Sequence, residues 1–130
     1  MRFEEVLTDG APKPIGPYSQ AVICGDLVFC SGQIGLDPAS GKIAGDDVAE
    51  QAERVMLNLE AVLEKAGASP STVVRTTLYL VNMADFASVN QVYSKHFGAA
   101  KPARSTVAVA SLPRDAKIEM EAIAFIPRGI

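Results

Sequence analysis

Residues 101–121, KPARSTVAVASLPRDAKIEME, contain two stretches of alternating residues separated by a short segment around Pro113. This alternation predicts two β-strands joined by a loop. The first strand opens with Arg104, and the second carries Glu119 and Glu121 on one face among apolar neighbours. Charges on an apolar strand are costly unless they are paired or used, so a functional site is expected here first.

The rest of the chain supplies further strands and two helices. Apolar and β-branched patterns predict strands over residues 3–7, 21–24, 27–31 and 71–82. Apolar residues at helical spacing predict one helix between an Asp47 cap and a Gly67 stop, and a second over residues 86–97 with Asp85 as its cap. The element order predicts a single α+β domain over residues 1–130, with two helices on one face of an antiparallel or mixed sheet.

The predicted hairpin over residues 21–31 is apolar on both faces of each strand, as in sheets that are covered on both sides. Two helices can cover only one side, and a partner subunit is a natural cover for the other. A two-residue turn at Gly25-Asp26 would point Cys24 and Cys30 to opposite faces, so we expect free thiols rather than a disulfide.

Composition argues against several classes of function. A net charge of −3, no tryptophan and no basic run disfavour nucleic-acid and anionic-membrane binding. The amino terminus has no signal-peptide pattern and no segment is long enough to span a membrane, so we expect a cytoplasmic protein. No His/Cys/Asp/Glu spacing suits a metal, and no glycine-rich phosphate loop occurs, so no metal or cofactor is expected.

Arg104 and Glu119 are the residues best suited to chemistry. Arg104 shares a strand face with small residues that leave room for its planar guanidinium to bind a carboxylate or phosphate. A glutamate beside an apolar sheet would have a raised pKa and could polarise a water. The alternative for Arg104, and for Glu119 with Glu121, is an ordinary ion pair.

Three other positions could contribute to a site. Tyr18 follows a loop constrained by two prolines around a glycine, which places the ring firmly, although a half-buried tyrosine at a tight turn fits equally well. Gly32 ends a strand where backbone can approach a ligand. His96, the single histidine, lies near the end of the second helix and is better explained as a partner of the helix C-terminus than as a base.

Four separated motifs resemble those of the Rid family, the reactive intermediate deaminases also called YjgF-like proteins. They are Ile15-Gly-Pro-Tyr-Ser-Gln20, Ser31-Gly-Gln33, Val89-Asn90, and the run from Pro102-Ala-Arg-Ser105 through Leu112-Pro113 to Ile118-Glu-Met-Glu-Ala-Ile-Ala124. They occur in order over nearly the whole chain. The resemblance implies a chorismate-mutase-like fold, a homotrimer with a cleft at each subunit interface, and hydrolysis of 2-iminobutanoate and 2-iminopropanoate to 2-oxo acids and ammonia.

By the same resemblance, Arg104 would bind the substrate carboxylate, Glu119 would activate water and Tyr18 would orient substrate or water. Ser31, the backbone at Gly32 and Thr106, and Asn90 would complete the site, while Glu121 is closer to a structural role. Thr106 stands where the family often has a cysteine. The substrates would be imino acids released by pyridoxal-phosphate dehydratases, a detoxification of reactive intermediates that needs no cofactor.

Two other functions stay open at this point. The same arginine could serve a non-catalytic protein that binds small carboxylates such as 2-oxo acids. RNA cleavage or translation inhibition, also attached to relatives, fits less well with the acidic net charge.

Overall fold

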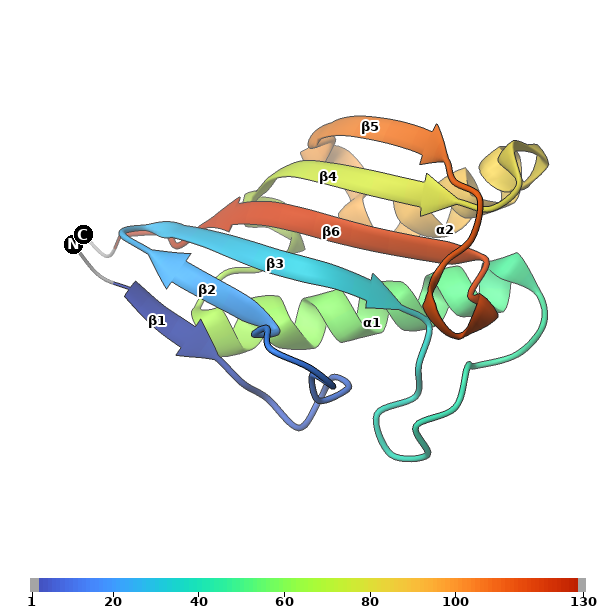
Figure 1. The fold of residues 1–130 in the computed structure, drawn as a ribbon. Helices are drawn as coiled ribbons and strands as arrows, with labels where there is room; N and C mark the ends of the chain where they lie inside the picture. Colours follow the sequence, from blue (N-terminus) through green and yellow to red (C-terminus); the bar gives the residue numbers. More distant parts are fainter. Residues whose placement is uncertain (1–2, 129–130) are drawn as a thin grey trace.

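The structure, a computed structural model, describes residues 3–128. Its strands are β1 (Phe3–Val6), β2 (Ala21–Cys24), β3 (Leu27–Ile34), β4 (Val73–Leu80), β5 (Ala103–Ala108) and β6 (Ile118–Phe125). Its α-helices are α1 (Val48–Ala66) and α2 (Phe86–Phe97), and single 3-10 turns occupy Pro70–Thr72, Met83–Asp85, Gly98–Ala100 and Pro113–Asp115. The two helices cover one face of a single sheet, as predicted (Figure 1).

The strand order is β1-β2-β3-β6-β4-β5. All neighbours are antiparallel except β4 and β5, which are parallel because α2 carries the chain back across the sheet between them. The sheet is therefore mixed. The two strands predicted within residues 101–121 exist as β5 and β6, but they do not pair: β4 lies between them.

The core lies between the sheet and the helices. The apolar stripe of α1 is buried, namely Val48, Ala52, Val55, Leu59, Val62 and Ala66. As predicted, the Asp47 carboxylate caps α1 by accepting a hydrogen bond from the Ala49 N–H, and Gly67 ends it in the left-handed conformation (φ 92°).

Asp85 occupies the N-cap position of α2, as predicted, but it does not cap the helix through its side chain. The Asp85 side chain makes no capping hydrogen bond, because a 3-10 turn, Met83–Asp85, precedes α2. Asn82 caps that turn instead, its side-chain oxygen accepting from the Ala84 N–H at 3.0 Å. In the sequence, Asn82 was the sign that the helical region begins before Asp85, because asparagine is as favourable at an N-cap as aspartate.

The hairpin register is as predicted: Cys24 pairs with Leu27, and Ala21 pairs with Cys30. The two cysteines form no disulfide. Cys30 points into the core, where burial raises the pKa of its thiol to about 12, so this thiol is chemically inert at neutral pH.

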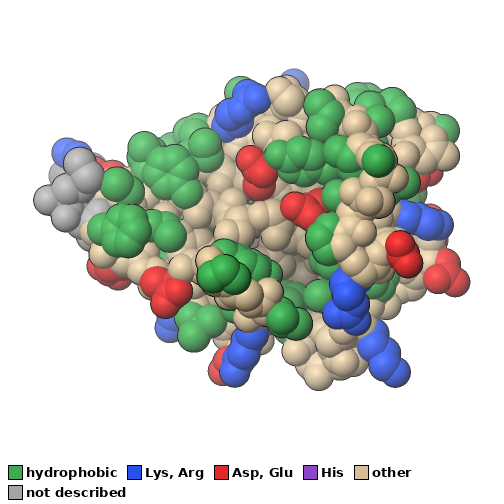
Figure 2. Space-filling model, viewed as in Figure 1, with side chains coloured by type: hydrophobic (Ala, Val, Ile, Leu, Met, Phe, Trp, Pro, Cys, Tyr) green, Lys and Arg blue, Asp and Glu red, His purple; other side chains and the backbone are tan. Residues whose placement is uncertain are grey.

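The face of the sheet opposite the helices, the helix-free face, is uncovered in the single chain. Phe3 is 75% exposed there, and Leu27 and Phe29 are each 42% exposed. Figure 2 views this face and shows hydrophobic side chains spread across it, with acidic side chains in a central hollow. The expected second cover of the β2–β3 hairpin is therefore not part of this chain, and a partner subunit remains the prediction for it.

Candidate active site

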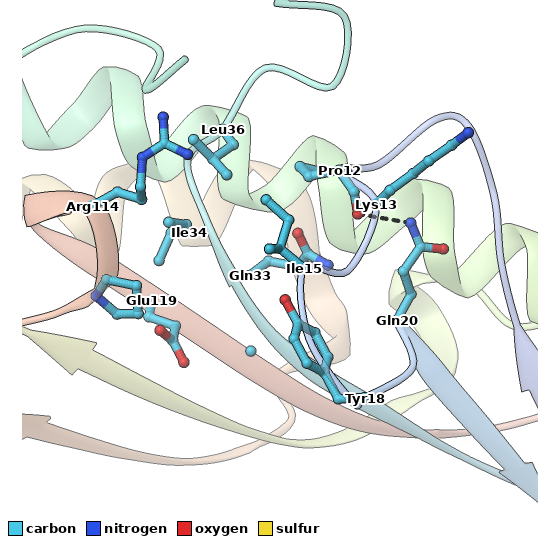
Figure 3. Close-up of a pocket in the computed structure, with 12 residues that line it drawn as sticks. Pro12, Lys13, Ile15, Tyr18, Gln20, Gln33, Ile34, Leu36, Arg114 and Glu119 are labelled. Atoms are coloured by element: carbon cyan, nitrogen blue, oxygen red, sulfur yellow. Dashed lines mark hydrogen bonds between the residues drawn. The ribbon is translucent and has the colours of Figure 1, made fainter. Parts of the chain in front are cut away.

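A cavity of about 270 Å³ lies where the loop before β2, the end of β3, the Pro113 loop and β6 meet. Its walls are Pro12, Lys13, Ile15, Tyr18, Gln20, Gly32, Gln33, Ile34, Leu36, Pro113, Arg114 and Glu119. Figure 3 shows Glu119 on its strand and Tyr18 on its loop, both lining this one cavity. Three of the predicted site residues, Tyr18, Gly32 and Glu119, therefore meet here.

Glu119 is the ionisable group of the cavity that is best prepared for proton transfer. It alternates with the buried Ile118 and Met120, so its carboxyl group projects from the helix-free face. Burial, and secondarily the charge of Glu121, raises the pKa of Glu119. The raised pKa brings this carboxylate closer to neutral pH, where a general base is most effective.

Gly32 leaves the space that the Glu119 carboxyl group occupies. A β-carbon on residue 32 would lie 2.9 Å from Glu119 Cδ and closer still to Oε2. The β3–β6 register shifts between Cys30 and Gln33, so Gly32 sits in an irregular part of the ladder. A larger residue at position 32 would displace this carboxyl group, so glycine is the residue that keeps it in place.

Glu121 has a different role from Glu119. It accepts a hydrogen bond from the Tyr79 hydroxyl at 2.9 Å, and this carboxylate raises the pKa of Tyr79. Glu121 is thus engaged across β4 and β6, which agrees with the structural role expected for it.

Tyr18 is held by its backbone and offers its ring to the cavity. Gly16 adopts φ 128°, and the Tyr18 N–H donates to the Gly16 carbonyl at 3.0 Å, which closes the tight turn predicted between the two prolines. The side chain is 55% exposed. The backbone of Tyr18 is therefore fixed, while its ring is accessible from solvent.

Gln20 holds the loop that forms one wall of the cavity, a role that was not predicted from the sequence. Its side chain is almost fully buried (1% exposed). Its Oε1 accepts from the Thr8 N–H at 2.7 Å, and its Nε2 donates to the carbonyls of Thr8, Ala11 and Pro12. Figure 3 shows the bond to Pro12. The available signal was a polar amide at the start of a strongly apolar strand, because such a buried amide must find partners.

Ser31 ties strand β3 to the segment that precedes β2. Its hydroxyl donates to the Ser19 carbonyl at 2.6 Å, and its N–H donates to the Gln20 carbonyl at 2.9 Å. These contacts position Tyr18, which lies immediately before the bonded carbonyl groups.

Arg104 lies elsewhere, on the helix side of β5. It is paired in register with Thr76, which points into the core, and its Nη1 donates to Asn90 Oδ1 on α2 at 2.8 Å. A second hollow of about 250 Å³ opens beside Arg104 and Asn90. Thr106 follows two residues later on the same face of the strand.

The predicted site residues therefore form two groups on opposite faces of one sheet. Tyr18, Gly32 and Glu119 line the cavity on the helix-free face, whereas Arg104 and Asn90 line the hollow on the helix side. A single copy of the chain does not bring the arginine and the glutamate together.

His96 belongs to neither group. Its Nδ1 lies 2.6 Å from Glu60 Oε1 and its Nε2 lies 2.8 Å from Glu53 Oε1, so it joins α2 to α1. Both carboxylates come from the other helix, rather than the backbone end of α2 that we expected as its partner.

The structure also bears on metal and membrane association. Within residues 3–128, no group of three or more His, Cys, Asp or Glu side chains is arranged to hold a metal ion. None of the helices in that part of the chain is long and apolar enough to cross a membrane.

Comparison with known proteins places these features in a family. A family model described as Endoribonuclease L-PSP matches residues 8–126. The chain is 53% identical over 125 residues to a RutC family protein of Pyrococcus abyssi, covering 96% of this chain and 98% of that one. It is 44% identical over 119 residues to the 2-iminobutanoate/2-iminopropanoate deaminase of Mus musculus, covering 92% and 88%.

A solved structure agrees. YyfA of Yersinia pestis, a protein of the conserved Rid family, matches with a TM-score of 0.94 at 37% identity, over 96% of this chain and 100% of that one. The four motifs, the fold and these relatives together lead to one conclusion. The chain belongs to the Rid, or YjgF-like, family, whose sequence model is described as Endoribonuclease L-PSP.

Proposed function

We propose that this protein hydrolyses reactive imino acids, with 2-iminobutanoate and 2-iminopropanoate as substrates, to 2-oxo acids and ammonia. The observation that carries the proposal is a partly buried Glu119 with a raised pKa, which lines one cavity together with Tyr18. The same chain carries Arg104, whose guanidinium is bonded to Asn90 through Nη1 and has further N–H groups to bind a carboxylate. The mouse relative named for this activity supports the choice of substrates.

The complete site forms between two copies of the chain, with Arg104 from one copy and Glu119 from its neighbour. Two features support this arrangement. The two groups lie on opposite faces of the sheet, and the helix-free face also exposes large hydrophobic side chains, including Phe29 and Phe125. A homotrimer, as expected from the family resemblance, would cover this face and bring an arginine to each cavity.

In the proposed reaction the Arg104 guanidinium binds the substrate carboxylate. The Glu119 carboxylate takes a proton from a water molecule as the water oxygen attacks the imine carbon, the C=N electron pair moves to nitrogen, and Glu119 passes that proton to the nitrogen. The resulting carbinolamine loses ammonia: Glu119 takes the hydroxyl proton and delivers it to the departing nitrogen as the C–N bond breaks and the C=O bond forms. Water and imine thus yield 2-oxo acid and ammonia, and the carboxylate is regenerated.

The test uses a threonine dehydratase reaction in which semicarbazide traps the surviving imine. Added protein is expected to lower semicarbazone formation, and Arg104→Ala and Glu119→Gln are each expected to abolish this effect. Glu64→Gln, on the outer side of α1, is the matched control and is expected to act like the wild type. Unchanged semicarbazone formation with the wild-type protein would refute the proposal.

Two alternative functions can be tested with the same purified protein. Binding of 2-oxobutanoate without turnover would identify a carboxylate-binding protein. RNA cleavage by nuclease-free protein, lost in Glu119→Gln, would favour the activity for which the family model is named.

A further inference from the structure

One face of α2 forms a holder for the Arg104 guanidinium. Phe86, Asn90 and Tyr93 are spaced i, i+4 and i+7, so they lie on the same side of the helix. Arg104 Cζ lies 4.8 Å from the centre of the Tyr93 ring and 5.3 Å from the centre of the Phe86 ring. Both distances are within the range of a cation–π contact.

The Tyr93 ring is itself fixed from two sides. Its hydroxyl lies 2.7 Å from Thr76 Oγ1, and Thr76 is a buried residue of the inner strand β4. Its ring also packs against Phe97, with ring centres 4.4 Å apart. The surface on which the guanidinium rests is therefore anchored in the core rather than mobile.

The holder leaves one edge of the guanidinium free. Nη1 is engaged by Asn90 Oδ1, and this is the one hydrogen bond that the Arg104 side chain makes within residues 3–128. Nε and Nη2 remain, and they form the side-on pair of donors that matches the two oxygens of a carboxylate.

We infer that Phe86 and Tyr93 are positioning residues that hold the Arg104 guanidinium with its Nε–Nη2 edge ready for the substrate carboxylate. This inference rests on the proposed function, in which Arg104 binds that carboxylate. Loss of a ring would leave Arg104 with its charge but without its orientation. Carboxylate affinity would fall, while the water activated by Glu119 would be unaffected.

The matched pair of variants is Tyr93→Leu and Tyr93→Phe. Leucine fills the site without a ring face, whereas phenylalanine keeps the ring and loses only the bond to Thr76. In Tyr93→Leu we expect KM for 2-iminobutanoate to rise about tenfold with kcat little changed. Tyr93→Phe is expected to keep KM near the wild-type value. Equal KM values in the two variants, or a loss confined to kcat, would overturn the inference.

A readout independent of turnover is the nuclear magnetic resonance signal of the Arg104 Nε–H group, identified by its loss in Arg104→Lys. A sharp, slowly exchanging signal is expected in the wild type and Tyr93→Phe, and a broadened, fast-exchanging one in Tyr93→Leu. Phe86→Leu removes the other ring and should act like Tyr93→Leu. The same result in both variants would show that the change does not come from a folding defect peculiar to one of them. If the wild type is inactive but this pattern holds, the holder is real and the proposed function is wrong. If the signal is the same in all variants, the holder is wrong whatever the activity.

Discussion

Replacement of Gly32 by alanine tests how closely the cavity is fitted around Glu119. The added β-carbon would lie 2.9 Å from Glu119 Cδ, and ordinary contacts begin at 3.4 Å, so Cδ must withdraw by at least 0.5 Å. Oε2, which is nearer, must move further. A displacement of about 1 Å at a reacting group can cost on the order of 100-fold in rate, so we expect kcat to fall by about that factor.

The same substitution should not harm the fold. The obstructing atoms are the end of a flexible side chain, which can swing away cheaply. Gly32 is not among the glycines with positive φ, and alanine also restricts the unfolded chain, which contributes about 0.4–1 kcal/mol of stability where the conformation is compatible. We therefore expect Gly32→Ala to unfold at the same or a slightly higher temperature while losing activity.

The assay is the imine-trapping reaction together with thermal unfolding of each variant. Glu119→Gln and the double variant complete the comparison. If Gly32→Ala acts by displacing the Glu119 carboxyl group, it should cost little more activity in a chain that already lacks this carboxylate. Additive losses, or a Gly32→Ala variant with wild-type kcat, would refute the reasoning.

Four further predictions concern the candidate site and its surroundings. Glu119→Gln should unfold at a higher temperature than the wild type at pH 7, because the raised pKa of Glu119 means that its negative charge destabilises the folded protein. Below the unfolded pKa of about 4.3 the carboxyl group is neutral in both states, so the difference in unfolding temperature should vanish at such a pH. The activity of the wild type should fall on the acid side at a higher pH than for an ordinary glutamate, which a pH–rate profile measures. Gln20→Ala should lose about 2–4 kcal/mol in urea unfolding, because it strands several buried backbone groups; a loss under 1 kcal/mol would contradict this. Asn90→Asp would place a carboxylate beside Arg104 Nη1 and should raise KM roughly tenfold, an effect that Asn90→Ala should not reproduce if the ion pair is the cause.

Local features of the fold were predictable from the chain because their causes are local. The periodic stripe of α1, its Asp47 cap and the register around Gly25-Asp26 depend on residues within a few positions of one another. The strand order could not be predicted in this way. That β4 inserts between β5 and β6 depends on contacts between segments distant in sequence, and the residues of all three strands show the same alternation.

Candidate residues for the site could be proposed from the sequence, but their layout could not. Arg104 and Glu119 stood out as charges on apolar strands, and motif resemblance gave them roles. Alternation along β5 could show that Arg104 and Thr106 share a face, but not that this face turns toward α2. Tyr93 and Phe86 belong to the apolar residues whose spacing predicts the helix over residues 86–97, and such a pattern does not reveal which of its members contact a cation.

The central claim, that each site combines Arg104 of one copy with Glu119 of another, is tested most directly by mixing two inactive chains. Arg104→Ala and Glu119→Gln are co-expressed with different tags, and assemblies carrying both tags are purified and assayed for imine hydrolysis. In a homotrimer, every mixed assembly, whether 2:1 or 1:2, has one of its three sites made from an intact Glu119 and an intact Arg104, so about one third of the wild-type activity should return. If the mixed assemblies stay as inactive as either parent, while tagged wild-type chains assembled in the same way are fully active, the site is not shared between copies.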